Sequence, residues 1–279
     1  MTNRDKIITR LNHDYWYVTN KGYKVFGVFL QGSQNYKLDY EGSDIDTKCI
    51  VLPTFEDIVL NKKPVSTTLV LEDNSHIDLK DIRLMWKCFL KQNINFLEIL
   101  FTEYYYIDAS YRNIWLRMQE MSEEIAHYDN YAAVNCICGM VLEKRAALCH
   151  PYPSLKDKID KYGYDNKQLH HILRCEEFLL RYINGAPYAD CLIPIHSKEL
   201  VEIKSKYIYN VEEAKEIADK ATSHATEVKD KYKLDNERVI NENVEKRMSQ
   251  VLVEALRESI LEDIKQLPWE RNYDYNETT

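Results

Sequence analysis

The sequence predicts an α+β protein with a small β-sheet in its N-terminal half and an all-helical C-terminal half. Short alternating or continuously apolar runs, which are typical of strands, occur only before about residue 130. After that point apolar residues recur at helical spacing. The 279 residues are 45% hydrophobic and 29% charged, which is the composition of a folded globular protein and not of a disordered chain.

The N-terminal half mixes helices and strands. Residues 4–21 are expected to form an amphipathic helix, because apolar residues recur at helical spacing: Ile7, Ile8, Leu11, Tyr15 and Val18. A strand is expected at 23–32, running into a turn at Gly32 and Ser33, and a second strand at 43–52, whose later residues are continuously apolar. A hairpin follows at 66–81, with its turn at residues 73–75. The next element is a helix at 81–92 with Asp81 in its first turn.

Helical spacing and capping residues organise the C-terminal half. Helices are expected at 131–149, ended by Pro151 and Pro153, and at 165–185, with Asp165 or Asn166 as N-cap and Gly185 as C-cap. Two more are expected at 211–231 and 236–267, the second with an apolar face made of Ile240, Val244, Met248, Val251, Ala255, Ile260, Ile264 and Leu267. Residues 269–279 form a polar tail that we expect to be frayed.

Charge and cysteine content limit the function classes. The formal net charge of −8 argues against a nonspecific nucleic-acid coat, although it leaves a local basic cleft open. Seven scattered cysteines do not form a disulfide framework, and Cys136 and Cys138 are interpreted as small buried residues and not as metal ligands. The sequence contains no apolar run of eighteen residues and begins with a charged, periodic segment, so we expect a cytoplasmic protein with no membrane partner.

Two carboxylates stand close together in the stretch GSQNYKLDYEGSDIDTK, which covers residues 32–48. In a strand, Asp44 and Asp46 present both charges to one face, which is electrostatically costly unless a cation shares the site. Oxygen ligands of this kind suit Mg²⁺ or Mn²⁺ bound together with substrate phosphates. The alternative is that Ser43 and Asp44 cap a turn and Asp46 is solvated.

Two further features favour a phosphate-handling site. Asp78 lies on a later predicted strand, and three carboxylates that converge from a small sheet can bridge two metal ions in nucleotidyl transfer. Gly32 and Ser33 follow a strand, where backbone N–H groups and a hydroxyl can contact phosphate oxygens. The conjunction predicts a metal site that holds a nucleoside triphosphate.

Other polar and aromatic residues are candidates for contact with the nucleotide. Lys167, His171 and Arg174 fall on one helical face, which suits a triphosphate tail, with a solvated charged face and a functional His170 as the alternative. Lys48 shares the strand face of Asp46 and either touches phosphate or forms a salt bridge. The remaining candidates are Tyr36 and Tyr40, which are base-stacking residues or core aromatics, and Glu98, which we interpret as structural.

These residues resemble the nucleotidyltransferase superfamily that includes DNA polymerase beta. The matching positions are Leu30, Gly32-Ser33 and Ser43-Asp44-Ile45-Asp46. The stretch 32–48, with Tyr36 at an aromatic position, is similar to the RNA-repair-ligase-associated nucleotidyltransferases of bacteria and phages. NINFLEIL, with Glu98, resembles a second motif of that family but lacks its proline. YDNKQLHHILR, with Lys167, His171 and Arg174, resembles a third. The resemblance covers roughly residues 20–205.

The resemblance implies an activity and a division of the chain. It implies a polymerase beta-like nucleotidyltransferase domain with a small mixed sheet at 1–125, a helical domain with the Lys-His-Arg motif at 126–205, and a C-terminal helical extension and tail at 206–279. It also implies that Asp44 and Asp46 bind metal, that Asp78 helps bind metal and accepts the proton of the acceptor hydroxyl, and that Gly32 and Ser33 hold the triphosphate. Two Mg²⁺ or Mn²⁺ ions are expected.

Three functions follow from these observations. The first is metal-dependent transfer of a nucleotide from an NTP, such as ATP, to RNA or tRNA. The second is the same chemistry on a protein or small-molecule hydroxyl. The third is a non-catalytic nucleotide sensor, which the intact set of three aspartates disfavours. The sequence does not identify the acceptor, the preferred base or the oligomeric state.

Overall fold

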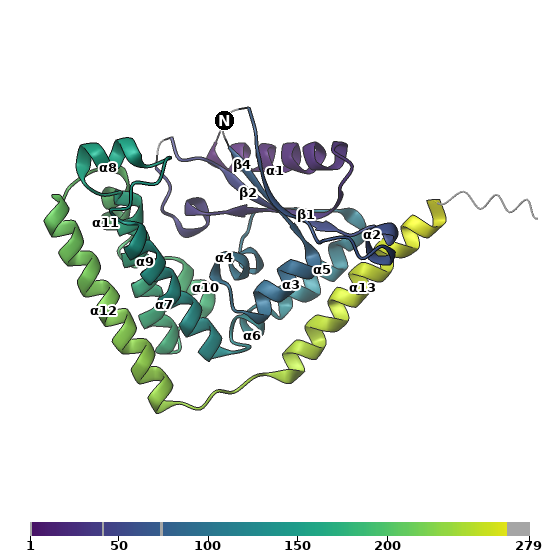
Figure 1. The fold of residues 1–279 in the computed structure, drawn as a ribbon. Helices are drawn as coiled ribbons and strands as arrows, with labels where there is room; N and C mark the ends of the chain where they lie inside the picture. Colours follow the sequence, from purple (N-terminus) through teal and green to yellow (C-terminus); the bar gives the residue numbers. More distant parts are fainter. Residues whose placement is uncertain (1, 41, 73–74, 267–279) are drawn as a thin grey trace, which may run out of the picture.

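A computed structural model describes residues 2–40, 42–72 and 75–266 (Figure 1). Its N-terminal half contains a five-stranded mixed sheet and its C-terminal half is helical, as the sequence predicts. The strand order is β3-β4-β2-β1-β5. The strands are β1 (Lys24–Gln31), β2 (Asp46–Leu52), β3 (Ser66–Val70), β4 (His76–Asp81) and β5 (Tyr105–Ile107).

The pairing of the strands brings distant segments together. β1 is antiparallel to β2 and β5, and β3 is antiparallel to β4, which confirms the predicted hairpin; Asp73 and Asn74 of its expected turn lie outside the described residues. β2 and β4 are parallel, and their register sets Lys48 directly opposite Asp78. β5 was not predicted, because three residues are too few to show a period.

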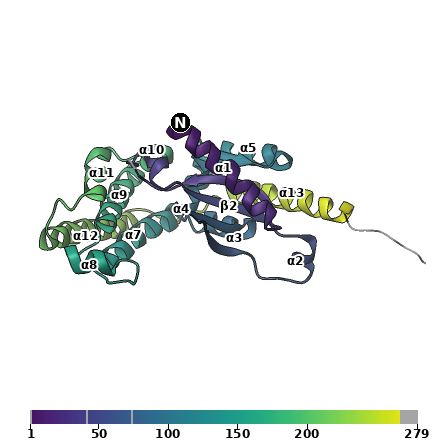
Figure 2. The same cartoon turned by 90° about the horizontal axis from the view of Figure 1, so that it is seen from above.

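Helices cover both faces of the sheet. α1 (Asn3–Asn20) lies across one face, where Leu11 and Val18 pack with Val28, Cys49 and Leu79 (Figure 2). The opposite face packs Phe29 and Ile50 into a larger core that continues into the C-terminal helices. Since side chains alternate along β2, Asp46 and Lys48 share this second face, while Thr47 points toward α1.

The other helices lie between the strands and along the C-terminal half of the chain. They are α2 (Phe55–Val59), α3 (Ile82–Leu90), α4 (Ile94–Leu97), α5 (Arg112–Glu120), α6 (Ser122–Ala126), α7 (Asn130–Ala147), α8 (Lys156–Tyr162), α9 (Asn166–Ile183), α10 (Tyr188–Leu192), α11 (Ser197–Ser205), α12 (Val211–Asp235) and α13 (Glu242–Gln266). Asp165 is the N-cap of α9, as predicted, but the C-cap is Asn184 and the predicted Gly185 follows it with a φ of 79°. Asp81 is the N-cap of α3 and not a residue of its first turn.

The two long C-terminal helices pack on different parts of the molecule. α12 lies along α7 and α9, whereas α13 turns back to α5, α3 and α2 beside the sheet (Figure 1). Lys24 Nζ pairs with Asp263 Oδ1 at 2.6 Å and donates to the Ser259 carbonyl, which fixes α13 to β1. α13 starts at Glu242, so Ile240 is not on its apolar face as predicted and pairs with Asp129 in an isolated bridge; Leu267 lies outside the described residues.

Two further findings bear on the expected chemistry of the chain. None of its seven cysteines forms a disulfide, in agreement with the sequence prediction. Within the part of the chain that the structure describes, no helix is long and apolar enough to cross a membrane.

Candidate functional site

The turn that follows β1 has the form expected of a phosphate-binding loop. Gly32 has a φ of 82°, a left-handed conformation that strongly favours glycine, and it caps the 3₁₀ helix η1 (Ser33–Tyr36). The Asn35 side chain donates to the Leu30 carbonyl at 2.7 Å and accepts from the Thr102 hydroxyl at 2.7 Å. These bonds fix the turn at the mouth of a cavity that Gly32 and Ser33 both line.

Asp44 and Asp46 line that same cavity, which has a volume of about 340 Å³. Asp46 is the first residue of β2, but Asp44 lies in the preceding loop, so the prediction that both belong to the strand is wrong for Asp44. The Ser43 hydroxyl accepts from the Tyr40 amide at 2.9 Å and caps a turn, as the alternative interpretation held. Asp46 is half-buried, however, and its Oδ1 atom is buried without a hydrogen bond.

Asp78 lies inside β4 and points into a second, adjoining cavity of about 520 Å³. It does not cap α3, because Asp81 does so. Its Oδ2 accepts a hydrogen bond from Lys48 Nζ at 2.9 Å, which is the salt-bridge alternative for that lysine. Lys48 is 2% exposed, and its ammonium lies 4.0 Å from the centre of the Phe96 ring. Burial lowers the pKa of Lys48, and the Asp78 carboxylate opposes that effect.

The polar face of α9 closes the first cavity from the opposite side. Lys167, His171 and Arg174 all line it, so the predicted helical face is brought to the predicted acidic residues. Arg174 is not solvated: it is 4% exposed, its Nε and Nη1 atoms have no hydrogen-bond partner, and its guanidinium lies 4.3 Å from the Tyr36 ring centre. Because Tyr36 is itself buried against this guanidinium, the structure places it as a support for Arg174 and not as a free base-stacking surface.

The two histidines of α9 have different environments. His170 is buried and its Nδ1 lies 2.9 Å from the Leu200 carbonyl, so this ring nitrogen carries the proton and donates it. Burial lowers the pKa of His170 to about 3 and that of His171 well below its usual value. His171 keeps a buried Nδ1 atom without a partner. Both rings are therefore neutral at pH 7, and His171 has hydrogen-bonding capacity available to a ligand.

Sequence reasoning missed three residues that line the first cavity. They are Lys158 of α8, Asn166 of α9 and Lys204 of α11. Burial, followed by the charge of Lys167, lowers the pKa of Lys204 to about 8, and its ammonium lies 5.2 Å from the centre of the Tyr40 ring. α8 directly precedes α9 but is a separate helix, and α11 is remote from the motifs in sequence, so helical spacing could not connect Lys158 or Lys204 with the site.

Glu98 belongs to the site and not only to the core. It begins the 3₁₀ helix η2 (Glu98–Leu100), is fully buried, and lines the second cavity with Arg174 and His171. Burial raises its pKa to about 8, which the charge of Arg174 and a hydrogen bond from the Gly32 backbone oppose. Its Oε2 atom has no partner.

The carboxylates fit one cation better than two. Asp44 and Asp46 offer oxygen ligands to one cavity. The Oδ1 atom of Asp46 accepts no hydrogen bond and lies 3.7 Å from His76 Nδ1, so it is suited to a hard cation that also binds phosphate oxygens. Asp78, by contrast, is already bonded to Lys48. In residues 2–40, 42–72 and 75–266, no three His, Cys, Asp or Glu side chains form a group that could hold a metal ion.

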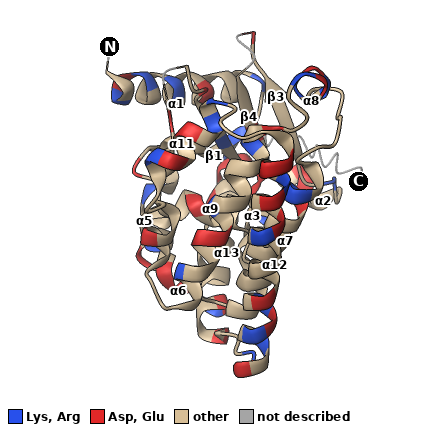
Figure 3. Ribbon diagram, turned by 90° about the vertical axis from the view of Figure 1, so that its left-hand side faces the viewer, with Lys and Arg blue, Asp and Glu red and all other residues tan. Residues whose placement is uncertain are grey.

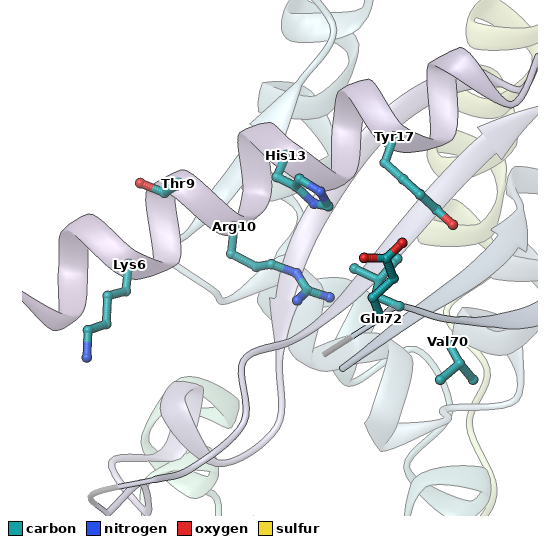
Figure 4. A pocket seen from close by; sticks show the side chains of 8 residues that line it. Lys6, Thr9, Arg10, His13, Tyr17, Val70 and Glu72 are labelled. Carbon is teal, nitrogen blue, oxygen red and sulfur yellow. The ribbon is translucent and has the colours of Figure 1, made fainter. Parts of the chain in front are cut away.

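A third cavity, of about 650 Å³, lies on the other face of the sheet, between α1 and β3 (Figure 4). Arg10, His13 and Tyr17 of α1 line it opposite Val70 and Glu72. Its central cation is bonded within the protein, because Arg10 Nε donates to Asp14 Oδ2 at 2.7 Å. This cavity therefore lacks the unpaired buried charge that marks the site on α9.

No family model and no curated protein sequence matches this chain. Among solved structures, the chain is similar to a nucleotidyltransferase-like protein from Exiguobacterium sibiricum 255-15 at 10% sequence identity, over 89% of this chain and 79% of that one, with a TM-score of 0.31. A TM-score this low supports no inference about function, so we infer the function from the chain's own side chains.

Proposed function

We propose that this protein is a metal-dependent nucleotidyltransferase that moves a nucleotide from an NTP to an acceptor hydroxyl. The observation that carries the proposal is Arg174, a buried guanidinium whose Nε and Nη1 atoms have no hydrogen-bond partner, in the cavity that also contains Asp46. A buried charge of this kind is costly unless an anion pairs with it. A triphosphate supplies that anion.

The cations of the first cavity would bind the triphosphate. Arg174, Lys167 and Lys204 come from α9 and α11 and line one side, while the Gly32-Ser33 turn lines the cavity near its acidic residues. Guanidinium and ammonium groups bind phosphate oxygens by charge-assisted hydrogen bonds. Tyr36 fixes the guanidinium plane of Arg174 before the ligand arrives, which lowers the ordering cost of binding.

Asp44 and Asp46 would hold Mg²⁺ or Mn²⁺ together with the phosphates. When bound, the ion neutralises charge that develops on the transferring phosphoryl group. Asp78 faces the neighbouring cavity and would accept the proton of the acceptor hydroxyl, whose oxygen attacks the α-phosphorus while pyrophosphate leaves. The two cavities share Gly32, Tyr36, Asp46, His171 and Arg174, so nucleotide and acceptor would meet at these residues.

We propose RNA as the acceptor. The second cavity is lined by the side-chain amides of Asn93 and Asn95, groups that bind phosphate and ribose hydroxyls. Acidic and basic residues are interspersed along the helices of a chain whose formal net charge is −8 (Figure 3). The first cavity is locally basic, because Lys158, Lys167, Arg174 and Lys204 line it together with Asp44 and Asp46.

A transfer assay tests the proposal. The protein is incubated with each α-³²P-labelled NTP, Mg²⁺ and total RNA, and in parallel with a lysate that has been treated with ribonuclease. We expect label on RNA, dependent on Mg²⁺ and absent with Asp46→Asn. Label on protein alone would replace RNA with a protein hydroxyl as acceptor, and no label on any acceptor, with no Mg²⁺-dependent NTP binding, would contradict the activity itself.

A further inference from the structure

We infer that Lys48 occupies the place of a second metal ion beside Asp78, so that the site holds one divalent cation, at Asp44 and Asp46. The inference rests on the proposed nucleotidyl transfer. It departs from the two ions expected from three converging carboxylates, because in this chain the third carboxylate already has a cation. That cation is the ammonium group of Lys48.

The sheet register makes this pairing a fixed feature of the fold. The parallel ladder between β2 and β4 aligns Lys48 with Asp78, and their side chains emerge on the same face. The Nζ–Oδ2 distance is 2.9 Å, which is a charge-assisted hydrogen bond. Neighbouring positions on adjacent strands cannot separate without breaking the ladder, so the ammonium stays within reach of the carboxylate.

The lysine also has little freedom to withdraw. It is 2% exposed, and the ring of Phe96, itself buried on α4, lies 4.0 Å from its ammonium. This contact holds the charge by a cation–π attraction on one side while Asp78 holds it on the other. A rotation of Lys48 toward solvent would give up both interactions.

A second ammonium raises the cost of placing a divalent cation at Asp78. Lys80 lies two residues further along β4 on the same strand face, and its Nζ is 5.0 Å from the centre of the same Phe96 ring. A divalent ion bound to Asp78 would lie beside the ammonium groups of Lys48 and Lys80. Asp46 differs from Asp78, because its buried Oδ1 atom accepts no hydrogen bond and the His76 ring nitrogen lies 3.7 Å from it.

Metal stoichiometry tests the inference without any turnover. The protein is saturated with α,β-methylene-ATP, whose α–β bridge cannot be cleaved, and bound Mn²⁺ is counted by electron paramagnetic resonance of free and bound ion. We expect one Mn²⁺ per chain in the wild type and in the control Lys80→Met. Lys48→Met should gain a second ion, with a dipolar coupling between the two Mn²⁺ centres.

The number of bound Mn²⁺ ions decides whether the inference holds. Two Mn²⁺ ions in the wild type overturn the inference, and so does a folded Lys48→Met variant that still binds only one. If Lys48→Met does not fold, the wild-type count decides alone. A wild type that binds neither the analogue nor Mn²⁺ contradicts the proposed function, and that result differs from the two-ion result that overturns the inference only.

Discussion

Two clusters of buried charge lie on opposite faces of the same strand. On the α1 face, Asp14 is fully buried and accepts hydrogen bonds from Arg10 Nε at 2.7 Å and from Thr47 Oγ1 at 2.5 Å. On the other face, Arg174 is almost as deeply buried and its Nε and Nη1 atoms have no partner. Asp46 belongs to the second cluster and Thr47, the next residue, to the first.

The difference lies in whether the buried charge has its partners within the protein. Buried charges stabilise a fold only when their partners satisfy them. The Asp14 cluster meets this condition, and the larger cavity beside it (Figure 4) therefore needs no ligand to explain its charges. The cluster around Arg174 does not meet it, and we propose that a charged ligand in its smaller cavity would supply the missing partner.

The largest effect is expected from the acidic side of the site. Asp46→Asn, like Asp44→Ala, should reduce transfer by on the order of 10³–10⁵-fold, because the ion held there is worth several kcal/mol in the transition state and each 1.36 kcal/mol is tenfold. The melting temperature in metal-free buffer should stay unchanged or rise, since like charges are removed. Asp230→Asn, at an exposed position of α12, is the control for both measurements. Near-normal transfer by Asp46→Asn would remove the metal role.

Asp78→Asn should separate binding from chemistry. The variant keeps one acceptor oxygen for Lys48 but loses basicity, so turnover at saturating NTP should fall roughly 10²–10⁴-fold, the range of a general base. NTP affinity, measured by calorimetry, should change little, because Asp44 and Asp46 remain. A variant with turnover within a few-fold of wild type would leave the proton acceptor unassigned.

Asp14→Ala breaks the paired cluster and should act on stability alone. It removes the carboxylate that accepts hydrogen bonds from Arg10 Nε and Thr47 Oγ1. Removal of one partner of a buried pair costs about 3–5 kcal/mol. Urea unfolding should show this loss, while NTP affinity of the folded variant stays at the wild-type value. A large loss of affinity without a loss of stability would show that the α1 cluster belongs to the site.

The variant Arg174→Met should not destabilise the protein, in contrast to Asp14→Ala. It replaces an unpaired buried cation with an apolar side chain of similar length, so the free energy of unfolding without ligand should stay the same or rise by about 1 kcal/mol. Arg181→Met, on the same helix but bonded to the Ile193 carbonyl, should lower it. Urea unfolding of the two variants side by side makes this comparison. Equal destabilisation by both would mean that Arg174 is satisfied in the free protein.

The variant Glu98→Gln tests the buried Glu98 carboxyl through the pH dependence of the free energy of unfolding. The folded-state pKa of Glu98, about 8, lies above its usual value of 4.5, so this group contributes stability below pH 4.5 that is lost as the pH rises toward 8. Relative to wild type, the glutamine variant should gain up to about 1.4 kcal/mol per pH unit across that interval. Urea unfolding at pH 5, 6.5 and 8 measures the slope, and parallel curves for both proteins would refute it.

The sequence predicts most of the fold because its long elements are periodic. β1, β2, β4, α1, α7 and α9 all follow from apolar spacing, whereas β5 and α8 are too short to show it. The residues of the site also divide into those that sequence spacing predicts and those that it does not. Lys167, His171 and Arg174 lie on one helix, so their common face is predictable, while Lys204 and the pairing of Lys48 with Asp78 depend on which helices and strands become neighbours.

Calorimetry of NTP and nucleoside binding tests the central claim, that the unpaired charge of Arg174 exists to bind a triphosphate. With Mg²⁺ present, Arg174→Met should weaken binding of the NTP by roughly 1.5–3 kcal/mol, the worth of a charge-assisted hydrogen bond, and leave binding of the nucleoside unchanged. Lys167→Ala should weaken NTP binding in the same range, and Arg181→Met should weaken neither. Equal NTP affinity of Arg174→Met and wild type would contradict the account.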